Sequence, residues 1–367
     1  MPELVFNLFA SCIPVKGKNR SIICDVYRGR FRYIPQALFY ILTKLKGRTI
    51  AEVKSTFMNK HDEIIDDYFK YLEENEFIFY CMKEELKMFP KLDLTFEFPS
   101  EITNCIIDID ESSDFDIASV FSQLAALHCR YLQLRFFSDV SIPAIISLCK
   151  PALQYGFNSI HLIVPFNTGM NKDSIAALYE SLPVSQLDFY NVPAKEIPKW
   201  EKAAARLPFQ FLPTAVLNEK HCGKTESSHF SINLYTFGEA QKFNSCLNKK
   251  LCIDAKGRIK NCPSMPVSYG DVRNVLLKDV LENSNFKTIW NIKKDDISVC
   301  SDCEFRYICT DCRAYLENPK DLYSKPLKCG YDPYTGTWQE WSSHPLKQEA
   351  IRYYEMEELV TTNTGKL

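Results

Sequence analysis

The chain has 367 residues, of which 46% are hydrophobic and 25% charged, and its formal net charge is −2. This balance argues against a general nucleic-acid binder and against a disordered chain. No run reaches the roughly 18 apolar residues of a membrane-spanning helix, and the first basic residues follow the apolar N-terminal stretch, unlike those of a signal peptide. We therefore expect a soluble cytoplasmic α/β protein with two or three domains and with neither nucleic-acid nor membrane partners.

Residues 1–88 form the first predicted unit. Strand-like segments rich in β-branched and aromatic residues lie at 5–15, 21–34 and 77–82. A helix begins at Pro35 and ends at Gly47, and a second begins at Thr49, where Glu52 completes a capping box. A third helix is predicted at 62–75. Strands combined with three short helices predict a small winged-helix-like module.

This pattern resembles PqqD-type domains, which recognise the leader peptides of ribosomally made natural products. The resemblance implies that an exposed strand edge accepts the precursor peptide as an additional strand. Residues 1–50 carry nine Lys/Arg against two acidic residues, and residues 51–90 carry five against ten. The basic half would favour acidic peptide segments. A packing domain and a DNA-binding winged helix are the alternatives, although the acidic third helix argues against a phosphate-facing surface.

Residues 95–235 alternate between strand and helix. Predicted strands lie at 102–110, 131–137, 159–166, 184–192 and 208–217, and predicted helices at 116–129, 142–157 and 172–182. Repeated β-α units of this length predict a parallel sheet with helices outside it. About four units are too few for a closed eight-fold barrel, so we expect a partial barrel or an open sheet.

The order of elements resembles the partial barrel of radical S-adenosylmethionine (SAM) enzymes, but the ligands are missing. That family places a Cys-x3-Cys-x2-Cys loop after the first strand, where three thiolates hold a cluster with one open iron. Here the loop reads "ESSDFD" and Cys105 stands alone in the strand before it. The turn after the second strand reads "FSDVS" where the family has glycines. We therefore expect a degenerate barrel that binds no SAM.

We expect the other cysteines and histidines in this part of the chain to have packing roles and no catalytic role. Free cysteines in apolar segments behave as small buried hydrophobes, which fits three of them: Cys105, Cys129 and Cys149. His128 and His161 are also interpreted as structural. The adjacent pair His221 and Cys222 lies in a Gly/Ser-bearing connector with no base or acid placed near it in sequence, so no catalytic residue is assigned.

Eight of the fifteen cysteines fall between residues 246 and 329. In a cytosolic chain such crowding indicates metal ligation, whereas disulfides need an oxidising compartment. The segment 251–262 predicts a β-hairpin whose turn, Asp254–Gly257, ends in a residue suited to positive φ. Two Cys-x-x-C turns follow in residues 300–312, and such turns direct two thiolates at one metal, as in zinc ribbons and iron–sulfur proteins. Eight thiols suffice for two four-ligand sites.

The order Cys-x10-Gly-x4-Cys, then Cys-x2-Cys-x5-Cys-x2-Cys, then Cys resembles the SPASM domain, which holds auxiliary [4Fe–4S] clusters. The resemblance covers residues 245–335 and implies two clusters with interleaved ligands. The first cluster would take Cys246, Cys252, Cys262 and Cys312. The second would take Cys300, Cys303, Cys309 and Cys329. The last pair is spaced by two residues where the family has three, and Cys252 falls in a predicted strand, so the first cluster is the less secure. Zinc is the alternative metal.

Two segments are similar in sequence to the SPASM-domain peptide maturase of grasp-with-SPASM cassettes, a graspetide type of ribosomally made peptide system. They are "SCLNKKLCIDAKGRIKNCPSMP" and "VCSDCEFRYICTDCRAYLENP". That family is described as lacking the radical SAM cysteine triad. The resemblance implies two partners, a precursor peptide and an ATP-grasp ligase, and favours an accessory or scaffold role. An active radical SAM enzyme with a variant site and a zinc-bound adaptor are the alternatives.

Three residues between the cysteine pairs, Phe305, Arg306 and Tyr307, are predicted to shield the second cluster. Arg313, next to Cys312, is predicted to offset cluster charge. Residues 336–367 are predicted to form a C-terminal tail with a helix.

Overall fold

The computed structural model describes residues 3–198, 200, 209–212 and 218–363. The N-terminal part contains an antiparallel sheet of β2 (Cys12–Lys16), β3 (Ser21–Asp25) and β4 (Arg30–Ile34), and a separate pair of β1 (Leu4–Leu8) and β5 (Ile78–Met82). Each of the first two predicted strand segments is therefore two strands joined by a turn. The three helices are α1 (Gln36–Lys44), α2 (Ile50–Thr56) and α3 (Asp62–Glu74), close to their predicted positions. The predicted capping box of Thr49 and Glu52 is confirmed.

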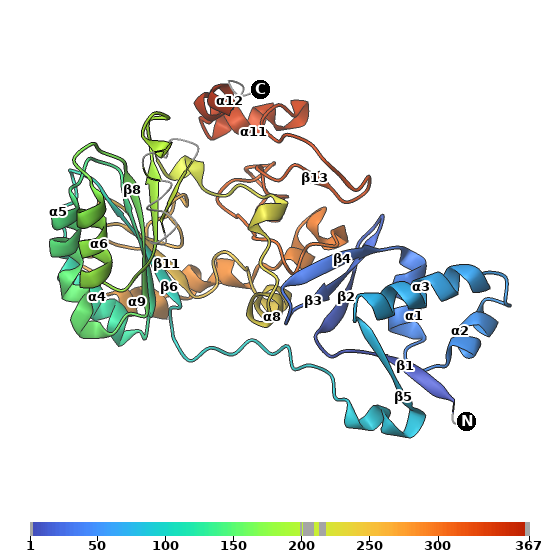
Figure 1. The fold of residues 1–367 in the computed structure, drawn as a ribbon. Coiled ribbons are helices and arrows are strands. Elements are labelled where there is room, and N and C mark those ends of the chain that lie inside the picture. Colours follow the sequence, from blue (N-terminus) through green and yellow to red (C-terminus); the bar gives the residue numbers. More distant parts are fainter. Residues whose placement is uncertain (1–2, 199, 201–208, 213–217, 364–367) are drawn as a thin grey trace.

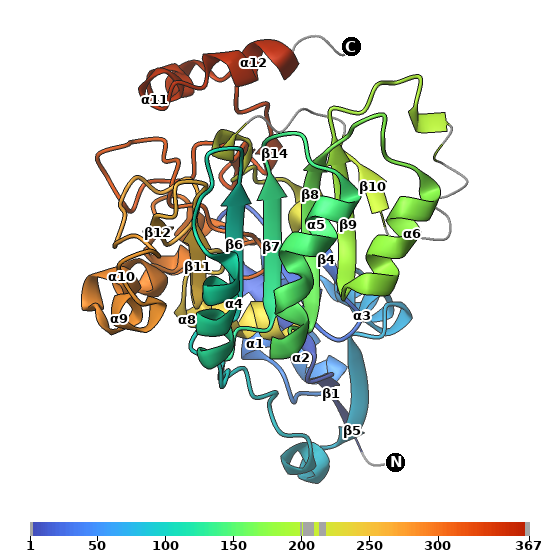
Figure 2. The ribbon, with the colours of Figure 1, turned by 90° about the vertical axis from the view of Figure 1, so that its left-hand side faces the viewer.

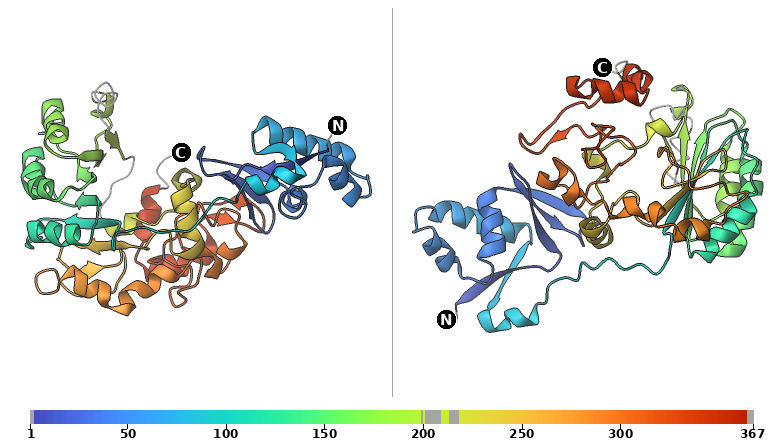
Figure 3. Two further views of the ribbon diagram at one scale, coloured as in Figure 1. Left: turned by 90° about the horizontal axis from the view of Figure 1, so that it is seen from below. Right: turned by 180° about the vertical axis from the view of Figure 1, so that it is seen from behind.

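The segment after β5 begins with the 3₁₀ helix η1 (Lys83–Met88) and then runs extended to the second sheet (Figures 1 and 3). It packs against α8 (Leu234–Lys242). A Cβ atom at Gly238 of that helix would lie 2.7 Å from the carbonyl oxygen of Leu94. The rings of Phe96 and Tyr235 pack edge to face with their centroids 4.8 Å apart. The linker is thus docked along much of its length.

The second sheet has seven strands in the order β10-β9-β8-β7-β6-β11-β12. Its parallel strands from the predicted β-α units are β6 (Asn104–Ile109), β7 (Tyr131–Phe136), β8 (Ser159–Pro165), β9 (Val184–Tyr190) and β10 (Phe209–Phe211). Three helices cover one face, α4 (Ile117–Ala126), α5 (Ile142–Cys149) and α6 (Lys172–Ser181) (Figure 2). The mixed α/β class and the parallel open sheet are confirmed. Residues 213–217 of the last predicted strand lie outside the described residues.

The predicted hairpin at 251–262 is confirmed as β11 (Lys250–Ile253) and β12 (Ile259–Lys260), with Gly257 at φ +80°. Sequence did not indicate that β11 would extend the second sheet, where it pairs in parallel with β6. Leu251 and Ile253 pair with Cys105 and Ile107, so their apolar side chains join the helix-covered core. The cysteine-rich segment therefore begins inside the sheet of the preceding unit.

The rest of the cysteine-rich segment is mostly loops beside the other face of this sheet (Figure 1). Its regular elements are α9 (Leu277–Glu282), α10 (Ser284–Thr288), β13 (Tyr331–Asp332), β14 (Thr337–Trp338), α11 (Gln348–Tyr353) and α12 (Glu357–Asn363). The remaining 3₁₀ segments of the described chain, inside and outside this segment, are η2 (Lys150–Tyr155), η3 (Glu219–His221), η4 (Ser227–His229), η5 (Ile289–Asn291), η6 (Lys294–Asp296), η7 (Cys300–Asp302) and η8 (Pro345–Lys347). The C-terminal tail is anchored, because Trp341, Ile351 and Met356 are buried in one cluster with Tyr315 and Leu327. None of the helices in the described ranges is both long and apolar enough to cross a membrane.

Candidate metal centres

Four of the predicted ligands, here called group II, come together around one internal cavity. They are Cys300, Cys303, Cys309 and Cys329. The free space at the centre of the cavity is narrow, about 20 Å³. A tight turn sets the first pair, since the N–H of Cys303 donates to the carbonyl of Cys300 at 3.0 Å. Cys329 reaches the cavity from a distant loop that pairs with Thr225. The fold thus joins thiols that are 29 residues apart in sequence.

A buried lysine lines the same cavity. Lys294 is 4% exposed, and its Nζ lies 3.7 Å from Cys309 Sγ and 3.7 Å from a carboxylate oxygen of Asp311. Asp311 is shared with the buried Arg313, whose Nη2 lies 2.8 Å from the same oxygen. Two cations facing one carboxylate leave this buried cluster of three side chains with a net charge of +1. Such a charge is costly in a protein interior unless an anion compensates it.

The thiols of group II can supply that anion only if they lose their protons. Burial raises the pKa of Cys300 to about 11 and that of Cys309 to about 12. Burial also disfavours the charged form of Lys294, but thiolates at Cys309 and Cys300, with Asp311, outweigh it and raise the lysine pKa. Metal ligation replaces the thiol protons and leaves thiolate ligands. The donor set therefore fits a metal cluster bound by four thiolates.

The segment between the cysteine pairs shields group II and also holds the N-terminal part in place. Phe305 is 2% exposed and packs against the rings of five residues: Phe31, Tyr33, Phe230, Tyr331 and Trp338. Glu304 is fully buried and accepts a hydrogen bond from Arg20 Nε at 2.9 Å. Arg306 donates to the backbone carbonyl of Lys16. The shielding predicted for this segment is thus combined with a docking role that sequence did not reveal.

Three of the four ligands predicted for the first cluster also lie near one another. We call Cys246, Cys262 and Cys312 group I. Electrostatic interactions link each of these thiols with the other two. Burial raises the pKa of Cys246 to about 12 and raises the pKa values of the other two as well. Group I is therefore a second cluster of thiols that are neutral in the metal-free protein, and each of its residues is partly exposed.

The fourth predicted ligand, Cys252, has different surroundings. It is buried in β11, where it pairs with Ile106 of β6. It therefore faces away from the helices, on the side of the sheet that carries Asp108 and Arg135. Its strongest electrostatic neighbours are these two residues, followed by Cys105 and only then by Cys262. The structure thus brings three of the predicted ligands together and leaves Cys252 beside them in the sheet.

Arg313 lies near Cys312, as predicted, and its positive charge acts to lower the pKa of that thiol. Its guanidinium is occupied by Asp311, by the carbonyl of Leu322 at 2.9 Å and by the carbonyl of Ser324 at 2.7 Å. The cations that face the thiols most directly are Lys294 at group II and Lys328, which interacts with Cys312. Lys328 directly precedes Cys329 in sequence, which is the one signal that could have marked it.

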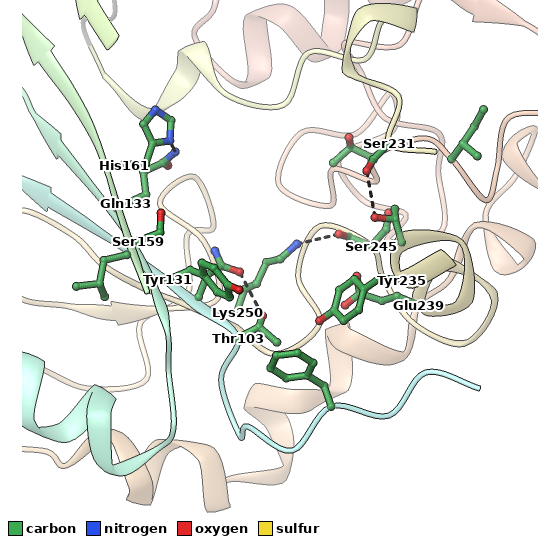
Figure 4. A pocket seen from close by; sticks show the side chains of 16 residues that line it. Thr103, Tyr131, Gln133, Ser159, His161, Ser231, Tyr235, Glu239, Ser245 and Lys250 are labelled. Atoms are coloured by element: carbon green, nitrogen blue, oxygen red, sulfur yellow. Dashed lines mark hydrogen bonds between the residues drawn. The ribbon is translucent and has the colours of Figure 1, made fainter. Parts of the chain in front are cut away.

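The free face of the second sheet borders a hollow of about 650 Å³. Figure 4 shows Gln133 and His161 projecting from the strands, with Tyr235 and Glu239 of α8 on the other side. Ser245, also in its wall, donates to the carbonyl of Cys309 at 3.1 Å. The hollow therefore lies next to the Cys309 segment of group II.

The histidines and isolated cysteines in and around this sheet are held by hydrogen bonds, packed in the core or placed at a helix end. His161 is held between Asp188 at 2.8 Å and Gln133 at 2.9 Å. His128 ends α4 with a positive φ of 58° and is exposed. Three cysteines, Cys105, Cys129 and Cys149, are at most 1% exposed in the main core, as predicted.

The loop after β6 is tied down by its own polar groups. Asp110 accepts from the N–H of Ser112 at 2.8 Å, and Ser113 Oγ donates to the carbonyl of Ala255 at 2.8 Å. Asp114 pairs with Arg273 at 2.7 Å. Residues 110–114 of this loop thus contain no thiol, and their hydroxyls and the carboxylates of Asp110 and Asp114 are engaged in hydrogen bonds or an ion pair.

Within the described ranges, no three His, Cys, Asp or Glu side chains stand close enough together to hold a single metal ion. A tetrahedral zinc site would need its thiolates at about 2.3 Å from one point. The group II thiols instead line the wall of a cavity.

No protein-family model matches the chain, and no curated protein matches it in sequence. Among solved structures, BtrN in an open conformation is 9% identical with a TM-score of 0.32, over 55% of this chain and 92% of that chain. SuiB of Streptococcus suis bound to S-adenosylmethionine is 10% identical with a TM-score of 0.30, over 88% of this chain and 98% of that chain. SuiB bound to the precursor peptide SuiA is 10% identical with a TM-score of 0.30, over 87% and 98%. Similarities of this size say nothing further about this chain.

Proposed function

We propose that the chain is a maturation protein for a ribosomally made peptide and that it holds two auxiliary [4Fe–4S] clusters. It binds the precursor peptide, acts beside an ATP-grasp ligase and does not cleave SAM. The observation that carries the proposal is group II, where three thiols of one short stretch and a fourth from a distant loop line one cavity beside the buried Lys294. Bound clusters would tie the loop-rich segment together and supply a redox-capable group.

The proposed peptide site is the free edge of β4. This strand lies at one end of the sheet β2-β3-β4, so its outer backbone groups are available to pair with an added strand. Arg32 and Tyr33 of β4 are exposed. The edge carries positive charge at Arg32, which favours an acidic stretch of precursor. Phe31 of the same strand packs on Phe305 of the group II loop. A peptide paired with β4 would therefore be separated from that loop by β4 alone.

The absence of SAM cleavage is proposed from the loop after β6. A SAM-binding cluster needs three thiolates and one open iron. The corresponding loop contains Ser112 and Ser113, both engaged in hydrogen bonds, and no cysteine. The clusters then have a structural, electron-transferring or substrate-positioning role.

The test combines metal analysis with a binding measurement on the anaerobically purified full chain. We expect iron and acid-labile sulfide, capture of the precursor peptide and the ligase, and no deoxyadenosine above background when SAM and a strong reductant are added. Arg32→Glu should weaken peptide binding about tenfold, whereas Arg48→Glu, outside the β4 edge, should not. Deoxyadenosine formation would instead support the radical enzyme, and zinc without iron would support the adaptor.

A further inference from the structure

The segment from Glu219 to Thr225 approaches group I from outside the cysteine-rich segment. Cys222 follows the short turn η3 in this segment. All fifteen cysteines lie within the described residues, and Cys222 is the exposed one. An exposed thiol alone says little, but this one lies next to the three partly buried thiols of group I.

Three contacts fix this segment over group I. Ser264 Oγ, two residues after Cys262, donates to the carbonyl of Glu219 at 3.0 Å. Lys328 Nζ donates to the carbonyl of Cys222 at 2.8 Å. Gly223 stands against Cys312, and a Cβ atom at the glycine would lie 2.8 Å from the Cys312 Sγ. The position next to Cys222 therefore has no room for a larger side chain, and Gly223 also has a positive φ of 84°.

The thiol of Cys222 has all of group I as neighbours. Electrostatic interactions link it with Cys246, Cys262 and Cys312. Cys252, by contrast, interacts first with the Asp108–Arg135 pair of the sheet. Four thiols that are at least 16 residues apart in sequence thus interact with one another.

A buried cation provides a second, independent observation. Lys328 is 3% exposed, and its ammonium lies 4.9 Å from the ring centre of Tyr315 and 5.6 Å from that of Trp341. It donates to backbone carbonyls and has no carboxylate partner among the ion pairs of the described chain. Its charge faces Cys222 and Cys312. Lys328 thus ties the Cys222 segment to the loop that leads to Cys329 and directs its cationic end towards group I.

We infer that Cys222 completes group I, so that the first cluster is bound by Cys222, Cys246, Cys262 and Cys312 and Cys252 is no ligand. This inference rests on the proposed cluster-holding function. It gives the cluster the four thiolates that a [4Fe–4S] centre takes. The exposed position of Cys222 makes the assignment directly accessible to thiol chemistry.

The first experiment compares Cys222→Ser with Cys252→Ser after anaerobic reconstitution. Cys222→Ser should lower the iron content and change the low-temperature EPR spectrum of one of the two reduced clusters. Cys252→Ser should retain the iron content and both spectra of the unaltered chain. A Cys222→Ser protein with unchanged iron and spectra overturns the inference, and so does loss of a cluster in a folded Cys252→Ser protein.

The second experiment needs no substitution. Iodoacetamide should alkylate Cys222 of the metal-free full chain readily, and cluster loading should slow that reaction at least about tenfold, because a metal-bound thiolate is a poorer nucleophile. Mass spectrometry of tryptic peptides identifies the site, and the buried Cys252 should stay unmodified in both forms. Equal alkylation of Cys222 in a chain that holds iron at both centres overturns the inference. A chain that binds no iron at all contradicts the proposed function itself, so the two failures are distinguishable.

Discussion

The two thiol groups differ in how they are assembled and closed. Three of the four group II thiols come from one ten-residue stretch, and the buried Phe305 covers them. Group I takes its thiols from separate segments and meets solvent at Cys222. Each group has its own buried lysine, Lys294 or Lys328. Close sequence spacing therefore brings three thiols of group II together, whereas tertiary structure assigns Cys312 to group I and Cys329 to group II.

The largest effect should come from dismantling group II. The double variant Cys303→Ser, Cys329→Ser should lose about half of the iron and sulfide and should unfold far more readily, because structural metal binding contributes on the order of 10 kcal/mol to folding. Cys81→Ser, outside both groups, should retain full iron. Elemental analysis and thermal unfolding check both variants. A double variant with full iron would show that group II is not a metal centre.

The next effect concerns the contact between the N-terminal part and group II. Arg20→Met leaves the fully buried Glu304 without its cation and should destabilise the chain by about 3–5 kcal/mol. Adding Glu304→Gln should restore part of the loss. Urea unfolding measures both changes. A chelator should then remove iron from group II of the Arg20→Met chain faster than from group I. Faster release from both groups would show that the contact is not specific to group II.

Lys328 gives a pH-dependent difference at group I. Burial lowers its pKa to about 8 in the metal-free protein, against 10.5 for an ordinary lysine. Between pH 8 and 10.5 the unfolded chain therefore binds more protons at this residue, so this contribution to stability rises with pH. The metal-free chain should gain up to about 3 kcal/mol relative to Lys328→Met over this range. Urea titrations at pH 7, 8.5 and 10 measure the difference, and a constant difference would contradict the assignment.

The smallest effect is a shift of reduction potential. Removing a positive charge beside a cluster makes its reduction less favourable, by on the order of 100 mV for a charge about 5 Å away at an effective dielectric of about 20. Lys294→Met should lower the potential of the group II cluster and leave group I near its original value. Lys328→Met should lower the potential of the group I cluster and leave that of group II near its original value. EPR-monitored redox titration distinguishes the two clusters, and equal shifts in both would contradict separate counter-ions.

Much of the fold could be predicted, because it rests on local patterns. The alternation of apolar strands and helices gave the parallel sheet, and the Thr49 capping box and the Gly257 turn depend on residues adjacent in sequence. The addition of β11 to β6 could not be predicted, because a short apolar strand does not encode its partner. The docking of Arg20 on Glu304 joins residues 284 positions apart and leaves no local signal.

The same distinction applies to the candidate centres. The family resemblance implied that Cys300, Cys303, Cys309 and Cys329 share one site, and the structure brings all four to one cavity. The resemblance also favoured Cys252, six positions after Cys246, but in a strand the direction of a side chain is set by register. The roles of Lys294 and Lys328 beside the thiols were not predicted, because the sequence does not show whether a lysine side chain is buried.

The most direct test of the account is the metal content of the anaerobically reconstituted full chain. The account predicts about eight iron and about eight acid-labile sulfide per chain, with about half of each lost in the group II double variant. About two zinc per chain with neither iron nor sulfide would contradict it.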